Sequence, residues 1–216
     1  MLNLIRKDLI IIKSYLIKAL AVLILYIFLF NKMDKQGMYM MGIYLIVQVL
    51  ISVSFYYGER AKEDYILKSI PINKKDVVLA KYASIIVYFI AYLILIYLIN
   101  FAINILDFDN IIKPIQISTV LLSISVIFIS ATIQLPIYFK FNYNKGRIVN
   151  SIIYILFFSM IFTLYDNNQL INHIRNNNFT NNMFGKIILI SPIVSLILFT
   201  ISSILSITIY EKKESM

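Results

Sequence analysis

The side chains in this sequence that could do chemistry are mild ones, amides and hydroxyls set within long apolar runs. Five are candidates to line a polar passage: Gln48, Ser52, Asn100, Asn104 and Gln134. In an apolar solvent such groups bond to a neighbouring helix, each bond contributing about 0.6 kcal/mol, or face a weakly polar passage between helices. Helix–helix bonding is the simpler interpretation for any single residue, and a passage is the functional one.

Groups that support catalysis or metal binding are scarce. The sequence has no cysteine, and its single histidine, His173, lies in an Asn-rich stretch without acidic neighbours. None of the five glycines begins a phosphate-binding loop of the G-x-x-x-x-G-K-[ST] type. The sequence therefore predicts no catalytic residue, no metal site and no bound cofactor, and a membrane-embedded enzyme is a weak hypothesis.

Composition indicates that lipid is the solvent for most of this chain. Of the 216 residues 60% are hydrophobic and 14% are charged, and the mean hydropathy is +0.82. Soluble domains carry about 25% charged residues. The net charge of +9 comes from residues that flank the apolar runs. It therefore reflects membrane orientation, and no nucleic-acid partner is expected.

The expected fold is an all-α integral membrane protein forming one domain over residues 1–216. A membrane span needs about 20 apolar residues. Six runs meet this requirement, at residues 14–30, 38–57, 82–106, 115–139, 148–165 and 187–210. With the N-terminus inside, fourteen of the 20 lysines and arginines fall on inside segments. The positive-inside rule thus predicts that both termini are cytoplasmic.

Residues 1–13 precede the first predicted span. Their apolar side chains can share one side of a helix, opposite Arg6 and Lys13. One interpretation is a solvated tail. The favoured one is an interfacial helix along the inner leaflet, because the apolar side is too large for a free tail.

Residues 58–81 form the longest segment predicted to lie inside. Opposite charges four residues apart favour a helix over residues 59–68, which Pro71 ends by pushing Ile70 to extended geometry. Asn73 is a good N-cap for a second helix, and Asp76 lies in its first turn. That second helix leads directly into the third predicted span.

The tip between these two helices is unusually apolar for a cytoplasmic loop. Six of the eight residues from 65 to 72 are Tyr, Ile, Leu or Pro. Such a tip needs a cover. It either packs back on the bilayer and neighbouring spans or, as we favour, docks into a groove on a cytosolic partner.

Residues 58–82, GERAKEDYILKSIPINKKDVVLAKY, resemble the ABC-2 type permease family. The shared pattern is an acidic stretch, L-x-S-I-P-I, a basic pair and A-K-Y entering the next span. Within the family, residues 58–82 are most similar to the small permeases of bacterial peptide exporters, including exporters of phenol-soluble modulins. The six predicted spans and the N-terminal interfacial helix extend the resemblance over the whole chain.

The resemblance implies a coupling helix between spans two and three that inserts into a separate ATPase. Carried over by position, the coupling residues are Glu59, Arg60, Asp64, Tyr65, Leu67, Ile70, Pro71 and Ile72. The partners would be two ATPase subunits holding ATP and Mg²⁺, and a second permease, identical or a close paralogue. The chain would export an amphipathic or hydrophobic peptide, with a lipid or drug-like amphiphile as the second candidate, from the bacterial cytoplasm across the plasma membrane. A stand-alone assembly protein, sensor or facilitator is the rival hypothesis.

Overall fold

The part of the chain that the computed structural model describes comprises residues 3–13, 15, 35–70, 72–105, 115–166 and 183–214, and its regular elements are all helices. Residues 3–13 form an N-terminal helix. The other helices are α2 (Lys35–Arg60), α3 (Glu63–Ser69), α4 (Lys74–Ile105), α5 (Ile117–Asp166) and α7 (Met183–Glu214).

Five helical stretches are long and apolar enough to cross a membrane, because each supplies at least 20 residues at 1.5 Å per residue. They are Gln36–Arg60, Lys74–Leu98, Ile117–Phe141, Tyr143–Thr163 and Lys186–Lys213. Each overlaps one of the last five predicted spans, so the chain is a multi-pass membrane protein. The first predicted span, residues 14–30, lies outside the described residues except for Tyr15.

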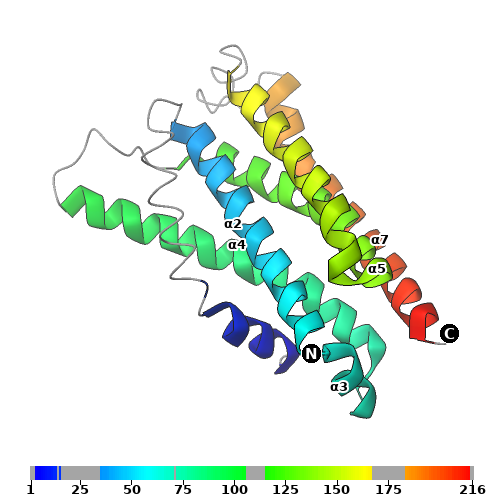
Figure 1. The fold of residues 1–216 in the computed structure, drawn as a ribbon. Helices are drawn as coiled ribbons and strands as arrows, with labels where there is room; N and C mark the ends of the chain where they lie inside the picture. Colours follow the sequence, from blue (N-terminus) through cyan, green and yellow to red (C-terminus); the bar gives the residue numbers. More distant parts are fainter. Residues whose placement is uncertain are drawn as a thin grey trace.

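The α5 helix reverses direction near its middle, so that one continuous helical stretch supplies two spans (Figure 1). In a straight helix residues 137 and 146 would be about 13.5 Å apart along the axis. Here a Cβ placed on Gly146 would lie 3.6 Å from Ile137 Cγ2. The basic segment expected as a loop between spans four and five is therefore a tight helical turn.

Burial differs greatly between the spans. In the most apolar part of the α2 span 72% of residues are buried, against 17% in Tyr143–Thr163 and 22% in Lys186–Lys213. The α2 helix is thus the centre of the bundle, with Met41, Ile43 and Val47 fully enclosed. The second half of α5 and the α7 helix present broad apolar faces outward, as lipid-facing helices do.

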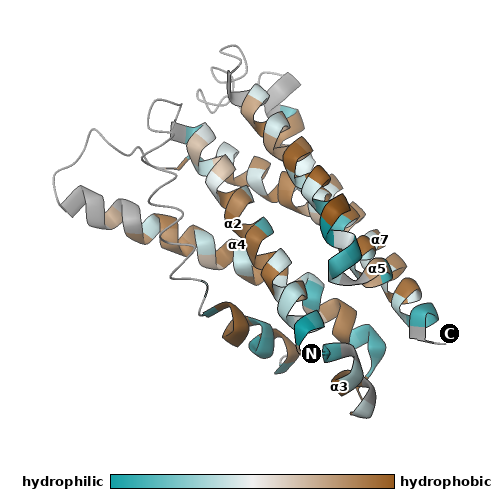
Figure 2. Ribbon diagram, viewed as in Figure 1, coloured by the Kyte–Doolittle hydropathy of each residue, from teal (hydrophilic) through white to brown (hydrophobic). Residues whose placement is uncertain are grey.

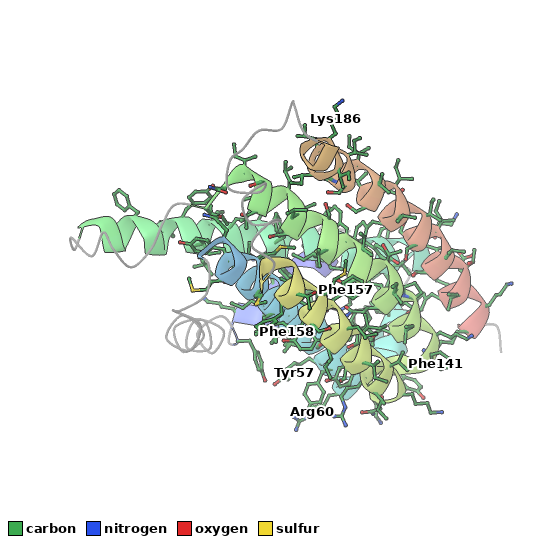
Figure 3. The ribbon with its side chains drawn as sticks, turned by 90° about the horizontal axis from the view of Figure 1, so that it is seen from above. Tyr57, Arg60, Phe141, Phe157, Phe158 and Lys186 are labelled. Atoms are coloured by element: carbon green, nitrogen blue, oxygen red, sulfur yellow. The ribbon has the colours of Figure 1, made fainter. Side chains whose placement is uncertain are left out.

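Polar residues gather at one end of the bundle, which we call the α3 end (Figure 2). The N-terminal helix, α3, the turn of α5 and the end of α7 all lie there, so both described chain ends are on the same side (Figure 1). Arg60, at the end of α2, and Lys186, near the start of α7, project from opposite sides of the bundle (Figure 3). A polar end next to an apolar body matches a membrane–water boundary.

Candidate functional site

A left-handed residue at the α3 end separates α3 from the end of α2. Lys62 has φ 51° and ψ 44°, a left-handed backbone conformation that residues other than glycine rarely adopt. The continuous helix expected over residues 59–68 is therefore wrong. The charge pairs favour helix on both sides of Lys62, but the break folds α3 back so that Glu63 approaches Gly58 of α2.

The segment after α3 follows the sequence expectation. Ile70 is extended, at φ −109° and ψ 139°, as the following proline requires. The α4 helix begins at Lys74, which puts Asn73 at the N-cap position and Asp76 in the first turn. The α4 helix continues directly into a span, and only four residues, 70–73, separate its start from the end of α3 at Ser69.

The α3 segment has an outer apolar face and an inner one. The outer face exposes Tyr65, Ile66 and Ile70, which are 73%, 54% and 45% exposed. The inner side chains, Leu67 and Ile72, pack against the hydrophobic core. Of the other residues implied as coupling contacts, Arg60 is exposed and Glu59 is partly buried, whereas Pro71 and the Asp64 side chain lie outside the described part.

Beneath the inner side of α3 is a cluster of four charged residues, the ion cluster: Lys7, Asp8, Glu63 and Lys81. Lys81 Nζ donates to Asp8 Oδ1 at 3.0 Å and lies 3.9 Å from Glu63 Oε2. Lys7 donates to Glu63 and lies 3.4 Å from Asp8 Oδ1. The cluster therefore joins the N-terminal helix, α3 and α4 through two cations and two carboxylates.

The centre of the ion cluster is dry. Asp8 is 1% exposed and Lys81 is 7% exposed. Lys81 Nζ also donates to Ser54 Oγ at 2.7 Å and lies 5.2 Å from the centre of the Phe55 ring. Buried charges are tolerated only when they are paired and hydrogen-bonded. The buried Lys81–Asp8 pair thus joins the N-terminal helix to α4, and Glu63 brings α3 to the same cluster.

A cavity of about 240 Å³ lies at the same end, between α3 and the ends of the spans. Its walls come from Phe55 of α2, Leu67 of α3, Val77 of α4, Tyr138 of α5 and Tyr210 of α7, among other residues. Lys213 Nζ closes one side by donating to the Phe139 carbonyl oxygen at 3.2 Å. With Tyr143 of the second half of α5, every described span therefore contributes to the wall of this cavity beside α3.

Glu59 joins α2 to the turn of α5. Its carboxylate accepts hydrogen bonds from the Asn144 backbone N–H at 3.0 Å and from Asn144 Nδ2 at 2.6 Å. The contact is solvent-exposed, so its contribution to stability is modest. It fixes the register between two elements of the α3 end through residues that are 85 positions apart in the sequence.

Substitution of Gly58 by alanine is expected to loosen α3 with little loss of stability. The new methyl group would occupy the position of a Glu63 carboxylate oxygen, which must move away from Lys7 and Lys81. Alanine also favours helix by about 1 kcal/mol over glycine, which offsets that loss. Protease accessibility of α3 should therefore rise while the thermal midpoint changes little. Unchanged accessibility would contradict this prediction.

Comparison with known families identifies the chain. The family described as ABC-2 family transporter protein matches residues 3–211, nearly the whole sequence. The chain belongs to the ABC-2 transporter family. Permeases of this family are membrane transport components that normally work with an ATPase subunit. Comparisons with curated proteins and with solved structures gave no match.

Three of the five candidate passage residues of this ABC-2 transporter chain meet at a second cavity. Gln48 and Ser52 of α2 and Gln134 of α5 line a space of about 420 Å³. Gln48 Nε2 donates to Ser130 Oγ at 2.8 Å, and Ser52 Oγ lies 3.4 Å from the Tyr138 hydroxyl oxygen. Helix–helix bonding and cavity lining are thus both present. The side chains of Asn100 and Asn104 lie outside the described part.

Two residues of the ABC-2 chain were missed by sequence reasoning. Asp8 shares one side of the N-terminal helix with Leu4 and Ile12, at intervals of four residues. An acidic residue on an apolar helix face signals a buried partner, and Lys81 is that partner. Asn150 lines the second cavity but resembles any other asparagine of this Asn-rich chain.

Proposed function

We propose that this chain is the membrane-spanning permease subunit of an ATP-binding-cassette exporter, with α3 as its coupling helix. In this proposal a separate cytosolic subunit binds and hydrolyses ATP with Mg²⁺. Movement of that subunit displaces α3, and α3 moves the spans. The permease itself performs no catalysis.

The observation that carries the proposal is the two-sided character of α3. Its outer face exposes Tyr65, Ile66 and Ile70 at a polar end of the molecule, where a cover is needed. Its inner side is bonded through Glu63 to Lys81 and Lys7. A segment that only rested on lipid headgroups would not need a buried ionic connection to a span. A segment that transmits movement to the spans does need one.

The ion cluster offers a physical route from α3 to the spans. Glu63 is the α3 member, and Lys81 lies two turns into α4. Asp8 adds the N-terminal helix to the same set of contacts. Displacement of α3 would change the separation of these charges in a dry site, where small changes in distance have large energies. This coupling route is a hypothesis of mechanism.

Chain connectivity supports the six-span topology in this proposal. The N-terminal helix lies at the α3 end, whereas α2 begins at the opposite end of the bundle (Figure 1). A sixth span over residues 14–30, as the sequence predicts, fits this arrangement, and the proposed topology has both termini in the cytoplasm, on the side that the positive-inside rule favours.

A pair of permeases, identical or closely related, with two ATPase subunits is the proposed assembly, in a bacterial plasma membrane. The proposed substrate is an amphipathic peptide, as in the exporters that residues 58–82 resemble. The rival function is a stand-alone sensor, assembly factor or facilitator, which would leave the outer face of α3 without a cover.

Co-reconstitution tests the proposal. The chain is expressed with candidate cytosolic ATPases, and the purified complex is placed in vesicles. ATP-dependent movement of an amphipathic peptide across the membrane, abolished in an ATPase variant lacking the phosphate-binding lysine, is the expected result. Peptide movement by the permease alone, without nucleotide, would favour the rival facilitator.

A further inference from the structure

The second cavity contains a buried amide without a partner. We call this space the amide cavity; it lies between α2 and the two halves of α5 and has a volume of about 420 Å³. Asn150 is 5% exposed, and among the residues that the structure describes neither its Oδ1 nor its Nδ2 has a hydrogen-bond partner. Buried polar groups are nearly always bonded, so an orphan amide that lines a cavity indicates a missing ligand or water.

The walls of the amide cavity combine aromatic rings with hydrogen-bonding groups. Tyr56, Tyr138, Tyr143 and Tyr154 supply rings, and two glutamines with two serines supply polar atoms. Several of the rings are held by neighbours: Tyr154 stacks on Tyr44 with centroids 5.7 Å apart, and Tyr138 stacks on Phe55 at 4.6 Å. Rigid apolar walls with a few fixed polar groups are typical of ligand sites of 300–1,000 Å³.

The charged lining of the amide cavity is positive only, within the described part of the chain. Arg147 is its only formally charged lining residue within the described part, and none of those lining residues is acidic. The nearby carboxylate of Glu59 lines the other cavity and bonds to Asn144. A ligand with an anionic end is therefore favoured over a cationic one. A guanidinium and an amide N–H both donate to carboxylates, the former with charge assistance.

The size of the amide cavity limits its occupant. A ten-residue peptide helix is about 15 Å long and 10 Å wide and so fills roughly 1,200 Å³. The cavity therefore admits one apolar chain or the last few residues of a peptide, with the remainder outside.

We propose that the amide cavity binds a carboxylate carried on an apolar chain, with the carboxylate bonded to Arg147 and Asn150 and the chain against the tyrosine rings. This rests on the proposed function, since it names the chemistry that the permease would accept. A fatty acid and the C-terminal end of an apolar peptide share this chemistry.

The test is binding to the full-length chain in phosphatidylcholine nanodiscs, without any ATPase. A photoreactive dodecanoate is cross-linked and its sites are mapped by mass spectrometry. Competitors are matched in pairs: dodecanoate against dodecanol, and an apolar hexapeptide with a free against an amidated C-terminus. We expect saturable labelling at the cavity and at least a tenfold preference for the carboxylate member of a pair, as charge-assisted bonds give.

Variants separate the site from general partition into lipid. Arg147→Gln should abolish the carboxylate preference, whereas Lys145→Gln, an exposed cation of the same turn, should keep it. Asn150→Leu should weaken labelling about tenfold, unlike Ser159→Leu, which alters an exposed serine on the same half of α5. Displacement by dodecanoate alone identifies a lipid-derived ligand, and displacement by the free-acid peptide identifies a peptide end.

Equal competition by dodecanol and dodecanoate, or labelling that neither variant changes more than its control, would overturn the inference. These outcomes are independent of the ATPase, so the proposed function could stand when the ligand site fails. Conversely, carboxylate-selective binding together with a failure of the separate co-reconstitution experiment would support the site and reject the exporter.

Discussion

Replacement of Lys81 by methionine is expected to lower the free energy of unfolding by about 3–5 kcal/mol, the usual cost of removing one partner from a buried ion pair. The substitution leaves Asp8, which is 1% exposed, and Glu63 to share the single cation of Lys7. It also removes the hydrogen bond to Ser54. Unfolding of the purified chain in mixed micelles measures the change.

Two further variants make this prediction specific. Lys145→Met removes an exposed cation and should change stability by about 0.5 kcal/mol or less. Lys81→Met combined with Asp8→Leu should recover most of the lost stability, because Lys7 and Glu63 then remain as a balanced ion pair. Equal effects of Lys81→Met and Lys145→Met would show that the ion cluster does not stabilise the fold.

Simultaneous substitution of Tyr65 and Ile70 by aspartate is expected to weaken binding of the ATPase about 1,000-fold. Both side chains are on the outer face of α3, and central interface residues of this kind cost about 2 kcal/mol or more each when removed. The permease should remain folded, because neither residue is buried in the described structure. Binding is measured on immobilised permease with purified ATPase.

Leu67→Asp is the matched comparison on the inner side of α3. Leu67 packs against the hydrophobic core, so this change should lower the thermal midpoint of the permease itself. The outer pair should weaken ATPase binding without that loss of stability. If the outer pair destabilises the permease and leaves binding unaltered, the outer face is structural and does not dock.

The sequence was sufficient to predict the spans because their signal is local. Each of the five described spans overlaps its predicted range, and the α4 helix begins beside its predicted N-cap, Asn73. The prediction of one helix across residues 59–68 was wrong because it rested on charge pairs within that segment, and such pairs say nothing about contacts with the rest of the chain. The break at Lys62 depends on Glu63 reaching Lys7 and Lys81, which are 56 and 18 residues away.

The candidate sites were predictable only in part, because they too depend on contacts between residues far apart in the sequence. The outer face of α3 follows from a run of apolar residues beside a proline, which a reader of the sequence can see. The ion cluster requires knowing that Asp8 and Lys81, 73 residues apart, lie together. Likewise Gln48, Gln134 and Asn150 are separate polar residues in the sequence, and only the reversal of α5 brings them to one cavity.

The proposed coupling role of α3 depends most on what covers its outer face, and a cross-linking residue at position 65 measures this directly. Tyr65→p-benzoylphenylalanine is introduced into the full chain, and intact cells are irradiated. We expect a covalent product with a cytosolic protein that contains a phosphate-binding loop, and we expect its yield to change when ATP hydrolysis is blocked. Attachment to phospholipid alone would contradict the coupling role of α3, because α3 would then lie on the membrane and contact no ATPase.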